Sequence, residues 1–571
     1  MKTTSRFLHL LVVLTISLLF LTLRISAQWS HDPNINTPIS TGTGNQVRPA
    51  LIGDGSGGAI ITWNDYRNGN FSDVYAQRVD SGGIALWNSN GVVINNANIQ
   101  PPITPNPPAI VSDGEGGAII VWHDFRGNRW TIYAQRINSS GIVQWEPNGV
   151  AFSFPSWPGP WVQLTPPAII SDGKGGAILV WGDFRDTKPR LSAQHINGSG
   201  VVQWNGMGVL VCDTVSTVVS SLIIGDGKGG AIISWIDNRI GNSTQLYSQH
   251  INAFGVRQWG SNGKRIWGMG GLQTAPTIID DGGGGAFITW KDHISGSANL
   301  YTQHVDSTGS EQWNQDAVVI STTAVTGTSG CSLVRGMTGE IIVVWSDRRN
   351  TANVDIYAQC INTAGVAEWN SGGIAIAATG NNESVPVIIS DTTGGVIVAW
   401  GDDNQDLYAQ KVNASGDVQW GPSGVLLCKS AASYPAIVSD CAGGMIVTWE
   451  TFRDDIDDDI YAQQISVSGD LGGLTDLVEA QGWFLTFRLN QNYPNPFNSN
   501  TKINFSIPEI NLVTLRIYNM FGQEIATLVE DYVHAGYHEI EFDGSNLSSG
   551  IYFYKLKAGN FCDTKKFVLL K

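Results

Sequence analysis

The chain has 571 residues, about four times the ~150 residues of an ordinary domain, so several domains or internal repeats are expected. Charged residues make up only 14%, while 67 residues are glycine and 21 are tryptophan. This composition excludes helical bundles and disordered tails, and it favours a turn-rich all-β protein. The 49 acidic against 33 basic residues give a net charge of −16, which disfavours nucleic acid and anionic membranes as partners.

The first 27 residues have the three parts of a secretory signal peptide. Lys2 and Arg6 precede an apolar run from Leu8 to Leu23, and Ile25-Ser26-Ala27 supplies a small-residue cleavage site. We therefore predict a signal peptide over residues 1–27. The alternative is an uncleaved anchor, which the short run, broken by His9, disfavours. No later apolar run approaches the length of a membrane span, so no transmembrane segment is expected in the mature chain.

An internal repeat occupies most of the remaining sequence. One unit reads roughly P-x-I-I-x-D-G-x-G-G-A-I-I-x-W-x-D-x-R, then a variable loop, then I-Y-A-Q-R-I-N-x-x-G-x-x-Q-W-x-x-x-G-V. Its first tryptophan recurs eight times at intervals of 49 to 59 residues, at Trp63, Trp122, Trp181, Trp235, Trp290, Trp345, Trp400 and Trp449. A period of this length is typical of propellers and solenoids.

Each unit contains four β-rich runs separated by turn signals. In the first unit these runs are Pro49 to Ile52, Ala59 to Trp63, Val74 to Val79 and Ile84 to Trp87. Four short strands per unit, with no helical periodicity, predict the blades of a β-propeller.

The two ends of the repeat region complement each other. The last unit lacks the Gln-Trp found at Gln144-Trp145 in the second unit, whereas the mature chain begins Gln28-Trp29. A ring hides its sheet edges by such a permutation. We therefore predict a closed eight-bladed propeller over residues 28–475, with the last blade completed by Gln28 to about Ser40.

The repeated polar residues are interpreted as structural. In W-x-D-x-R, for example Asp65 and Arg67, we expect the aspartate to cap backbone amides and the arginine to pair with the neighbouring blade. A charged ring that binds an ionic ligand is the alternative. His195, His250 and His304 replace Arg78 and Arg136 at one repeat position, so they are poor candidates for a general base.

The sequence gives little reason to expect a cofactor or a catalytic centre. The aspartate of D-G-x-G-G has too few neighbouring oxygen ligands for calcium, and the better but weak calcium candidate is the acidic run with Asp455, Asp457 and Asp459. No nucleophile elbow, phosphate loop or zinc motif occurs. Six cysteines without CxxC pairs are interpreted as small buried apolar residues, with any pairing undetermined.

Tryptophans outside the repeat are the best candidates for ligand binding. Trp130, Trp157, Trp161 and Trp267 fall in loops that follow the second strand or join blades, which places them on one face of a propeller. Aromatic side chains in such loops suit stacking on sugar rings or contact with an apolar partner. The alternative is that they pack the long loops onto the blades.

The composition changes after a linker at residues 476–488. Residues 489–571 contain alternating runs that predict a small Ig-like β-sandwich. This segment resembles the C-terminal sorting domain of the type IX (Por) secretion system of Bacteroidetes. The matching residues include Tyr493-Pro494-Asn495-Pro496-Phe497, Gly522, Gly536, Gly550 and the terminal Lys571. A departure is Phe542 where many relatives have tryptophan. The resemblance implies export through the periplasm by the type IX machinery, to the surface or the medium.

The leading hypothesis is a secreted or surface-bound propeller without catalytic activity that binds polysaccharide or a surface protein. A carbohydrate-active hydrolase or lyase is the first alternative, because a propeller can hold two carboxylates at a channel mouth. The carboxylates seen outside the repeat are Glu146, Glu311, Glu368 and Glu383. A structural surface-layer protein is the second alternative.

Overall fold

A computed structural model describes most of residues 29–472 and 488–571, and those residues form strands, turns and connecting segments. Outside the described residues lie 1–28, 70–71, 100–105, 125, 127–130, 153–165, 184–189, 215–217, 242, 267–270, 295–296, 314–316, 323–329, 350–352, 392, 430–431, 453–456, 473–487, 490–491, 493–494, 508–510, 534–535 and 560. The predicted signal peptide and nearly all of the predicted linker are among them. The chain divides into two compact units, Met1–Gly473 and Leu474–Lys571, and each is described by itself.

The first unit is propeller-like. Its described residues form eight four-stranded antiparallel sheets, here called sheets 1 to 8 in chain order. Sheets 1 to 7 each use four consecutive strands. Sheet 8 has the order β30-β31-β32-β1, so its fourth strand comes from the N-terminal end of the described chain, and β1 pairs with β32 through Thr37 and Ala462.

The strands fall into four positional classes. The first strands are β2 (Gln46–Gly53), β6 (Ala109–Ser112), β10 (Ala168–Ser171), β14 (Val218–Gly225), β18 (Leu272–Asp280), β22 (Cys331–Arg335), β26 (Glu383–Ser390) and β30 (Ala432–Ser439). The second strands are β3 (Ala59–Asp65), β7 (Ala118–Asp124), β11 (Ala177–Asp183), β15 (Ala231–Ile240), β19 (Ala286–Ile294), β23 (Ile341–Asp347), β27 (Val396–Asp402) and β31 (Met445–Phe452). The third strands are β4 (Ser72–Val79), β8 (Thr131–Ile137), β12 (Arg190–Ile196), β16 (Ser243–Ile251), β20 (Ser297–Val305), β24 (Asp355–Ile361), β28 (Leu407–Val412) and β32 (Asp458–Ile465). The fourth strands are β5 (Val92–Ile99), β9 (Val150–Ala151), β13 (Val209–Leu210), β17 (Lys264–Arg265), β21 (Val318–Ser321), β25 (Ile374–Ala377), β29 (Val425–Cys428) and β1 (Thr37–Ser40).

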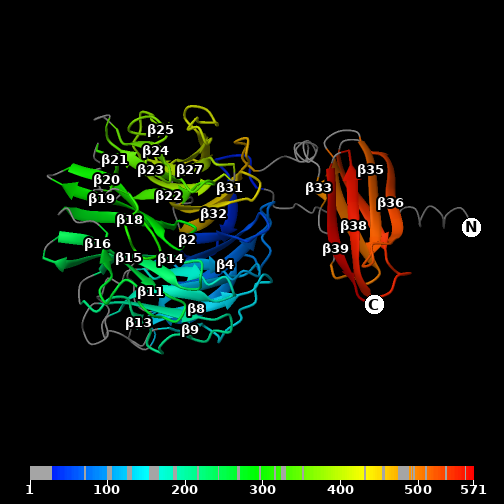
Figure 1. Cartoon of the computed structure of the whole chain (residues 1–571), viewed down its shortest axis with the longest axis horizontal. Coiled ribbons are helices and arrows are strands. Elements are labelled where there is room, and N and C mark those ends of the chain that lie inside the picture. The colour runs from blue at the N-terminus through cyan, green and yellow to red at the C-terminus, as the bar shows by residue number, and fades with distance from the viewer. Residues whose placement is uncertain are drawn as a thin grey trace, which may run out of the picture. The chain divides into compact units, whose positions relative to one another are not determined.

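The sheets pack through their faces. First strands of consecutive sheets contact one another in chain order, and β2 of sheet 1 contacts β30 of sheet 8. In Figure 1 the first strands β14, β18 and β22 lie toward the middle of this unit, with β9, β16, β20 and β25 nearer its edge. The apolar clusters follow the same order, because each joins two consecutive sheets and one joins sheet 8 to sheet 1. Burial of these sheet faces provides most of the apolar stabilisation of the unit.

The prediction that Gln-Trp belongs to the fourth strand is wrong. In sheet 1 the fourth strand begins at Val92, five residues after Trp87. The backbone N–H of Trp87 donates to Oε1 of Gln77 on the third strand, and Nε2 of Gln77 donates to the carbonyl of Asn88. A buried glutamine therefore binds the main chain between the two strands, in place of continuous strand pairing.

These tryptophans connect neighbouring sheets instead. Each donates its indole N–H to a backbone carbonyl in the turn between the third and fourth strands of the next sheet, over 2.9 to 3.2 Å. Trp29, which is buried, makes the corresponding bond to Ser81 of sheet 1. The N-terminal segment thus holds sheet 1 through Trp29 and sheet 8 through β1.

The second unit has two sheets around one core. One sheet has the order β33 (Arg488–Leu489), β34 (Asn500–Ile507), β37 (Gly536–Asp543). The other has the order β36 (Glu524–Val533), β35 (Asn511–Asn519), β38 (Gly550–Ala558), β39 (Phe561–Leu569). Residues from both sheets form the core, including Ile503, Phe505, Leu515, Tyr554 and Phe567. This is a two-layer packing of sheets, as the alternating sequence predicts.

We expect Trp29→Ala to lower the free energy of unfolding of the first unit by about 3–5 kcal/mol, because it removes a buried indole and an inter-sheet hydrogen bond. Urea unfolding of the chain from Gln28 onward, followed by fluorescence and circular dichroism, measures this loss. Ile35→Ala is the matched control in the same segment, since Ile35 is 63% exposed, and it should change stability by less than about 0.5 kcal/mol. Equal stability of the Trp29 variant and the parent would contradict the role given to the N-terminal segment.

Candidate functional site

The four tryptophans predicted to bind ligand, Trp130, Trp157, Trp161 and Trp267, lie outside the described residues. Their role stays a prediction. Asp455 of the weak calcium candidate also lies outside them. Asp457 accepts a hydrogen bond from the backbone N–H of Gly44 at 2.9 Å, and Asp459 lies in β32. Within the described ranges no three or more histidine, cysteine, aspartate or glutamate side chains are grouped so as to hold a metal ion.

The aspartate of the D-G-x-G-G turn organises each hairpin between the first and second strands. Oδ1 of Asp54 accepts the backbone N–H groups of Ser56 and Gly58, while Oδ2 pairs with Arg78 at 2.9 Å. In sheets 3 to 5 a histidine replaces the arginine, and the pairs Asp172–His195, Asp226–His250 and Asp281–His304 each measure 2.9 Å. Each of the three histidines thus pairs with the aspartate of a structural turn.

The W-x-D-x-R residues form a lock within one sheet. Trp63 donates its indole N–H to Oδ2 of the buried Asp65, and Arg67 pairs with the same carboxylate. The Arg67 guanidinium also lies 3.9 Å above the ring of Tyr75 and donates to the carbonyl of Asn90. The carboxylate, the ring and Asn90 belong to sheet 1, but the Arg67 guanidinium also donates to the hydroxyl of Ser40 in β1 of sheet 8 at 3.3 Å. Arg126 of sheet 2 likewise donates to Asn95 of sheet 1 at 3.0 Å. The predicted contact with the neighbouring blade is therefore confirmed for these arginines, although the ion pair stays within one sheet.

The cysteines are free thiols, and the prediction that all are buried is wrong for two of them. Cys212, Cys331, Cys360 and Cys428 are buried, whereas Cys441 and Cys562 are exposed. Cys441 lies at a turn tip in sheet 8, where its backbone has a left-handed φ of 60°. Burial raises the pKa of the Cys331 thiol to about 12, so this thiol is unreactive at neutral pH.

The carboxylates predicted to stand outside the repeat occupy separate places. Glu383 is buried in β26 and accepts hydrogen bonds from Thr379, and burial raises its pKa. Glu368 binds Asn362 through a 3.2 Å hydrogen bond in sheet 6. Glu311 forms an isolated bridge with Val305 in sheet 5, and Glu146 lies between sheets 2 and 3. They come from different sheets, so no two of them form an evident catalytic pair.

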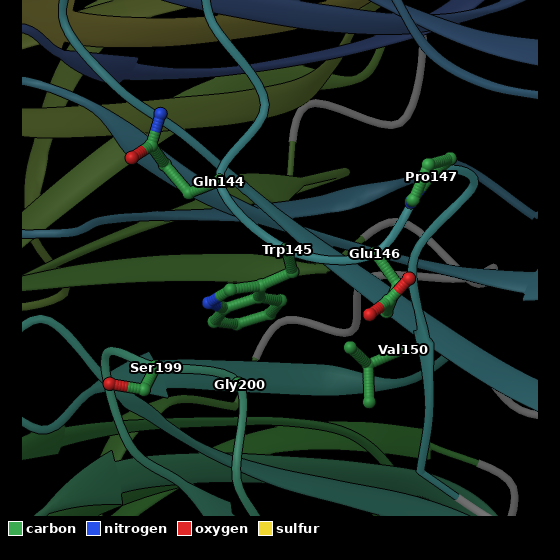
Figure 2. A pocket seen from close by; sticks show the side chains of 7 residues that line it. All are labelled: Gln144, Trp145, Glu146, Pro147, Val150, Ser199 and Gly200. Atoms are coloured by element: carbon green, nitrogen blue, oxygen red, sulfur yellow. The ribbon is translucent and has the colours of Figure 1, made fainter.

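A hollow of about 580 Å³ surrounds Glu146, lined by Gln144, Trp145, Glu146, Pro147, Val150, Ser199 and Gly200. Figure 2 shows the Trp145 indole of sheet 2 beside the Ser199-Gly200 turn of sheet 3. A Cβ atom on Gly200 would lie 3.0 Å from Trp145, and the φ of Gly200 is +80°. The same tryptophan-on-glycine contact recurs between the other sheets, as at Gly141 and Trp87. The wall that Trp145 and Gly200 form is therefore a feature of the repeat, which makes the hollow a weak candidate for a specific site.

A stronger candidate lies where sheet 8 meets sheet 1. We call it the 8/1 corner and define it as Arg48, Tyr434, Glu450, Phe452 and Asp458. Arg48 and Tyr434 occupy the same position in first strands β2 and β30, each before a proline and inside a bulge. The guanidinium of Arg48 lies 3.9 Å from the centre of the Tyr434 ring. The bulge allows matching residues of neighbouring sheets to meet, since both have a left-handed φ, 59° and 53°.

Three residues of sheet 8 complete the corner. Glu450 and Phe452 lie two residues apart on β31, so both point to the same face of that strand. Asp458 opens β32 directly opposite Phe452. Glu450 accepts the backbone N–H of Arg48, which shows that this face is turned to sheet 1. The corner thus combines two aromatic side chains, half exposed at 50% for Tyr434 and 46% for Phe452, with an arginine and two carboxylates.

Burial and like charge perturb both carboxylates. Burial raises the pKa of Glu450, the Arg48 N–H and charge oppose that rise, and the charge of Asp458 adds to it. Burial also raises the pKa of Asp458, and Asp457 raises it further. Perturbed carboxylates beside exposed aromatic side chains are typical of functional sites. The sequence prediction did not include this corner. A signal was present, because Glu450 is the only carboxylate at the middle position of W-x-D among the eight repeats.

The sorting-domain residues support the core of the second unit. Phe497 is buried and packs against Phe542 and Phe567. Phe542 therefore fills a position in the core. Gly522 has a φ of +76° in the turn between β35 and β36, and Gly536 and Gly550 open β37 and β38. The backbone N–H of Lys571 donates to Ser549, while Asn495 and Pro496 precede Phe497, and Tyr493 and Pro494 lie outside the described residues.

Residues 491–570 match the secretion system C-terminal sorting domain. This segment is a type IX sorting domain. The match confirms the resemblance seen in the sequence, and it means that the protein is exported to the cell surface or secreted, with handling by the type IX machinery. In the described residues no helix is both long enough and apolar enough to cross a membrane.

No curated protein matches the sequence. Similar solved structures include PorZ, a surface component of the type IX secretion system of Porphyromonas gingivalis, at 11% identity and a TM-score of 0.33 over 92% of this chain and 70% of that one. Drosophila Semaphorin 2a has 8% identity and a TM-score of 0.37 over 95% and 99% of the two chains. The NanB sialidase of Streptococcus pneumoniae has 10% identity and a TM-score of 0.33 over 66% and 68%. Similarities this distant assign neither a ligand nor an activity.

Two substitutions should change the pH dependence of stability in opposite directions. Because the folded-state pKa of Glu450 is raised, stability falls as pH rises above about 4.5, and Glu450→Gln should remove this fall. Burial opposes ionisation of Asp172, but the His195 bond and two backbone N–H bonds outweigh it and lower its pKa. Asp172→Asn should therefore cost about 1.5–3 kcal/mol at pH 7, and this cost should shrink as pH falls below about 4.

Urea unfolding of the parent and both variants between pH 3 and pH 7 measures these changes. If stability depends on pH in the same way in Glu450→Gln and in the parent, while Asp172→Asn shifts this dependence as expected, the raised pKa of Glu450 is contradicted.

Proposed function

We propose that this protein is a polysaccharide-binding propeller that the type IX machinery delivers to the cell surface or the medium. In this proposal the first unit is a ring of eight blades closed by β1, and the Ig-like second unit is the export signal. The eight apolar clusters join consecutive sheets, and one of them joins sheet 8 to sheet 1. This order and the pairing of β1 with β32 support the ring. The sorting domain supports the destination.

The observation that carries the binding role is the pair of exposed aromatic side chains in the 8/1 corner. Trp63 and its seven counterparts are buried between sheets, so the repeat itself presents few aromatic faces to solvent. Tyr434 and Phe452 depart from that pattern, and each has a polar neighbour, because Arg48 lies over the Tyr434 ring and Asp458 pairs with Phe452 across β31 and β32. An aromatic face with polar groups at its edge suits a sugar ring, which has an apolar face and a polar rim.

A carbohydrate-active hydrolase or lyase is the second candidate. The raised pKa of Glu450 favours a carboxyl that keeps its proton, as a general acid requires, and Asp458 lies close enough to influence it electrostatically. Release of reducing or unsaturated ends by the mature chain, abolished in Glu450→Gln, would favour this candidate. Binding without any release of product, in both the parent and the variant, favours the binding module.

The binding role is tested with the purified mature chain, from Gln28, on an array of plant, algal and bacterial polysaccharides. Two stacking contacts are worth about 0.5–1.5 kcal/mol each, so Tyr434→Ala/Phe452→Ala should weaken binding by about tenfold or more. Phe254→Ala is the control, because Phe254 is an aromatic residue 85% exposed in a turn of sheet 4. A parallel Trp157→Ala/Trp161→Ala variant tests the loop tryptophans. Failure to bind any polysaccharide would overturn the proposal and favour a protein partner.

Export is tested by deleting Asn490 to Lys571. The truncated chain should accumulate in the periplasm, because the type IX machinery has no sorting domain to recognise. Fractionation and surface labelling of the producing cells measure its location. Substitution of the exposed Ile525 by alanine is the control, since Ile525 is not in the core of the unit. Surface display of the truncated chain at the level of the parent would contradict the assigned route.

A further inference from the structure

The position of Arg48 depends on a bulged backbone that other first strands share, since Ala275, Val385 and Tyr434 also have a left-handed φ before a proline. The φ of Arg48, 59°, lies in the left-handed region, which non-glycine residues seldom adopt, and the proline that follows makes this conformation still less common. The bulge between Val47 and Ala50 requires it. Such a backbone conformation costs about 1–3 kcal/mol, and it persists only where the surrounding structure stabilises it. In return, the side chain leaves the plane of β2 and reaches Tyr434 of sheet 8.

The charge of Arg48 is offset only in part, because it attracts the charge of Glu450 without forming an ion pair with it. Other arginines of the first unit, such as Arg67, Arg78, Arg126, Arg136, Arg239 and Arg349, pair with a carboxylate. Arg48 forms no ion pair with any side chain in the described ranges, and its guanidinium contacts the Tyr434 ring instead. Glu450 binds its backbone N–H, and among the described residues no hydrogen bond is formed by the guanidinium donors. Stacking on an aromatic face fixes the plane of the guanidinium, so its N–H groups form a preorganised fork.

From this arrangement we infer that the 8/1 corner recognises a hexuronate residue within a polysaccharide, with the sugar carboxylate bound by Arg48. A planar guanidinium matches a carboxylate through two parallel hydrogen bonds. Phe452 and the free part of the Tyr434 ring offer apolar surface to the sugar ring, and Glu450 offers an acceptor for its hydroxyl groups. This inference rests on the proposed polysaccharide-binding function and names the class of sugar for that site.

The nearby carboxylates limit the ligand to low charge density. Asp458 acts electrostatically on Glu450, and Asp457 acts on Asp458. A heavily sulfated chain or a nucleic acid would bring several negative charges against these carboxylates. A single carboxylate per sugar can reach Arg48 while the remaining contacts are to hydroxyl groups. The corner therefore fits a uronan better than a sulfated polymer.

Isothermal titration of the mature chain with trigalacturonate and with the neutral α-1,4-galactotriose tests the inference, because the two sugars differ in their carboxyl groups. The parent should bind trigalacturonate at least tenfold more tightly. Arg48→Lys keeps the charge and loses the fork, so it should remove about tenfold of that affinity, and Arg48→Gln should remove the preference. Arg335→Gln is the control, since Arg335 is ion-paired to Asp280 in sheets 5 and 6. Urea unfolding confirms that each variant is folded.

The outcomes separate this inference from the proposed function. Equal binding of the two trisaccharides, or a preference that survives Arg48→Gln, overturns the uronate assignment and leaves polysaccharide binding standing. Absence of binding to both trisaccharides by a folded parent also overturns the assignment, and the polysaccharide array then decides the broader proposal. A preference lost in the folded Arg48→Gln variant, with Arg335→Gln unchanged, is the supporting result.

Discussion

The contact between one tryptophan and one glycine of the next sheet holds the first unit together. The indole N–H reaches a carbonyl of the neighbouring turn, and the ring lies flat against the glycine that closes that turn, as Trp145 does on Gly200. A side chain at the glycine would collide with the ring, and its φ of +80° also favours glycine. The close ring and the positive φ constrain the same residue, so any side chain at that position would be strained. The pairs are Trp29–Gly83, Trp87–Gly141, Trp145–Gly200, Trp204–Gly255, Trp259–Gly309, Trp313–Gly365, Trp369–Gly416 and Trp420–Gly469.

This constraint limits where the residues of the first unit can vary. Most sheets need the same tryptophan, glycine, aspartate and arginine to pack, so these residues cannot also recognise a ligand. Sheet 8 is less constrained, because Thr451 replaces the aspartate that binds the first tryptophan in sheets 1, 2, 4 and 6. The buried indole N–H of Trp449 and the hydroxyl of Thr451 have no hydrogen-bond partner in the described structure. Sheet 8 thus lacks the tryptophan–aspartate hydrogen bond that stabilises sheet 1. Glu450, which lies between Trp449 and Thr451, accepts the backbone N–H of Arg48.

The repeat predicts the first unit well because its signals are local. Tryptophan spacing, D-G-x-G-G turns and alternating strands locate the first three strands of each sheet from short segments. The fourth strand was misplaced because its boundary depends on a glutamine one strand away, as Gln77 shows for Trp87. The contact of Arg67 with the neighbouring sheet was predicted, as its bond to Ser40 shows, but its position over Tyr75 is not encoded in spacing.

The 8/1 corner could not be predicted for a related reason. Arg48 and Tyr434 are 386 positions apart in the sequence, and they meet only because matching bulges open in neighbouring sheets. A signal was present, in that both residues precede a proline at the start of a first strand. That signal indicates a bulge but does not identify the sheet that faces it. The loop tryptophans, which the sequence favoured, stay a separate prediction.

Net charge and local charge act on a uronate ligand in opposite directions. The chain carries −16, which repels an acidic polysaccharide at long range, whereas Arg48 attracts one carboxylate at contact. Salt near 0.1 M screens interactions beyond about 10 Å and has less effect on a partly buried pair at contact distance. Added salt therefore weakens the repulsion more than the contact, which is the reverse of the response of a nucleic-acid-binding protein. An acidic protein can thus bind an acidic sugar through one preorganised arginine, provided that the ligand presents its charges singly.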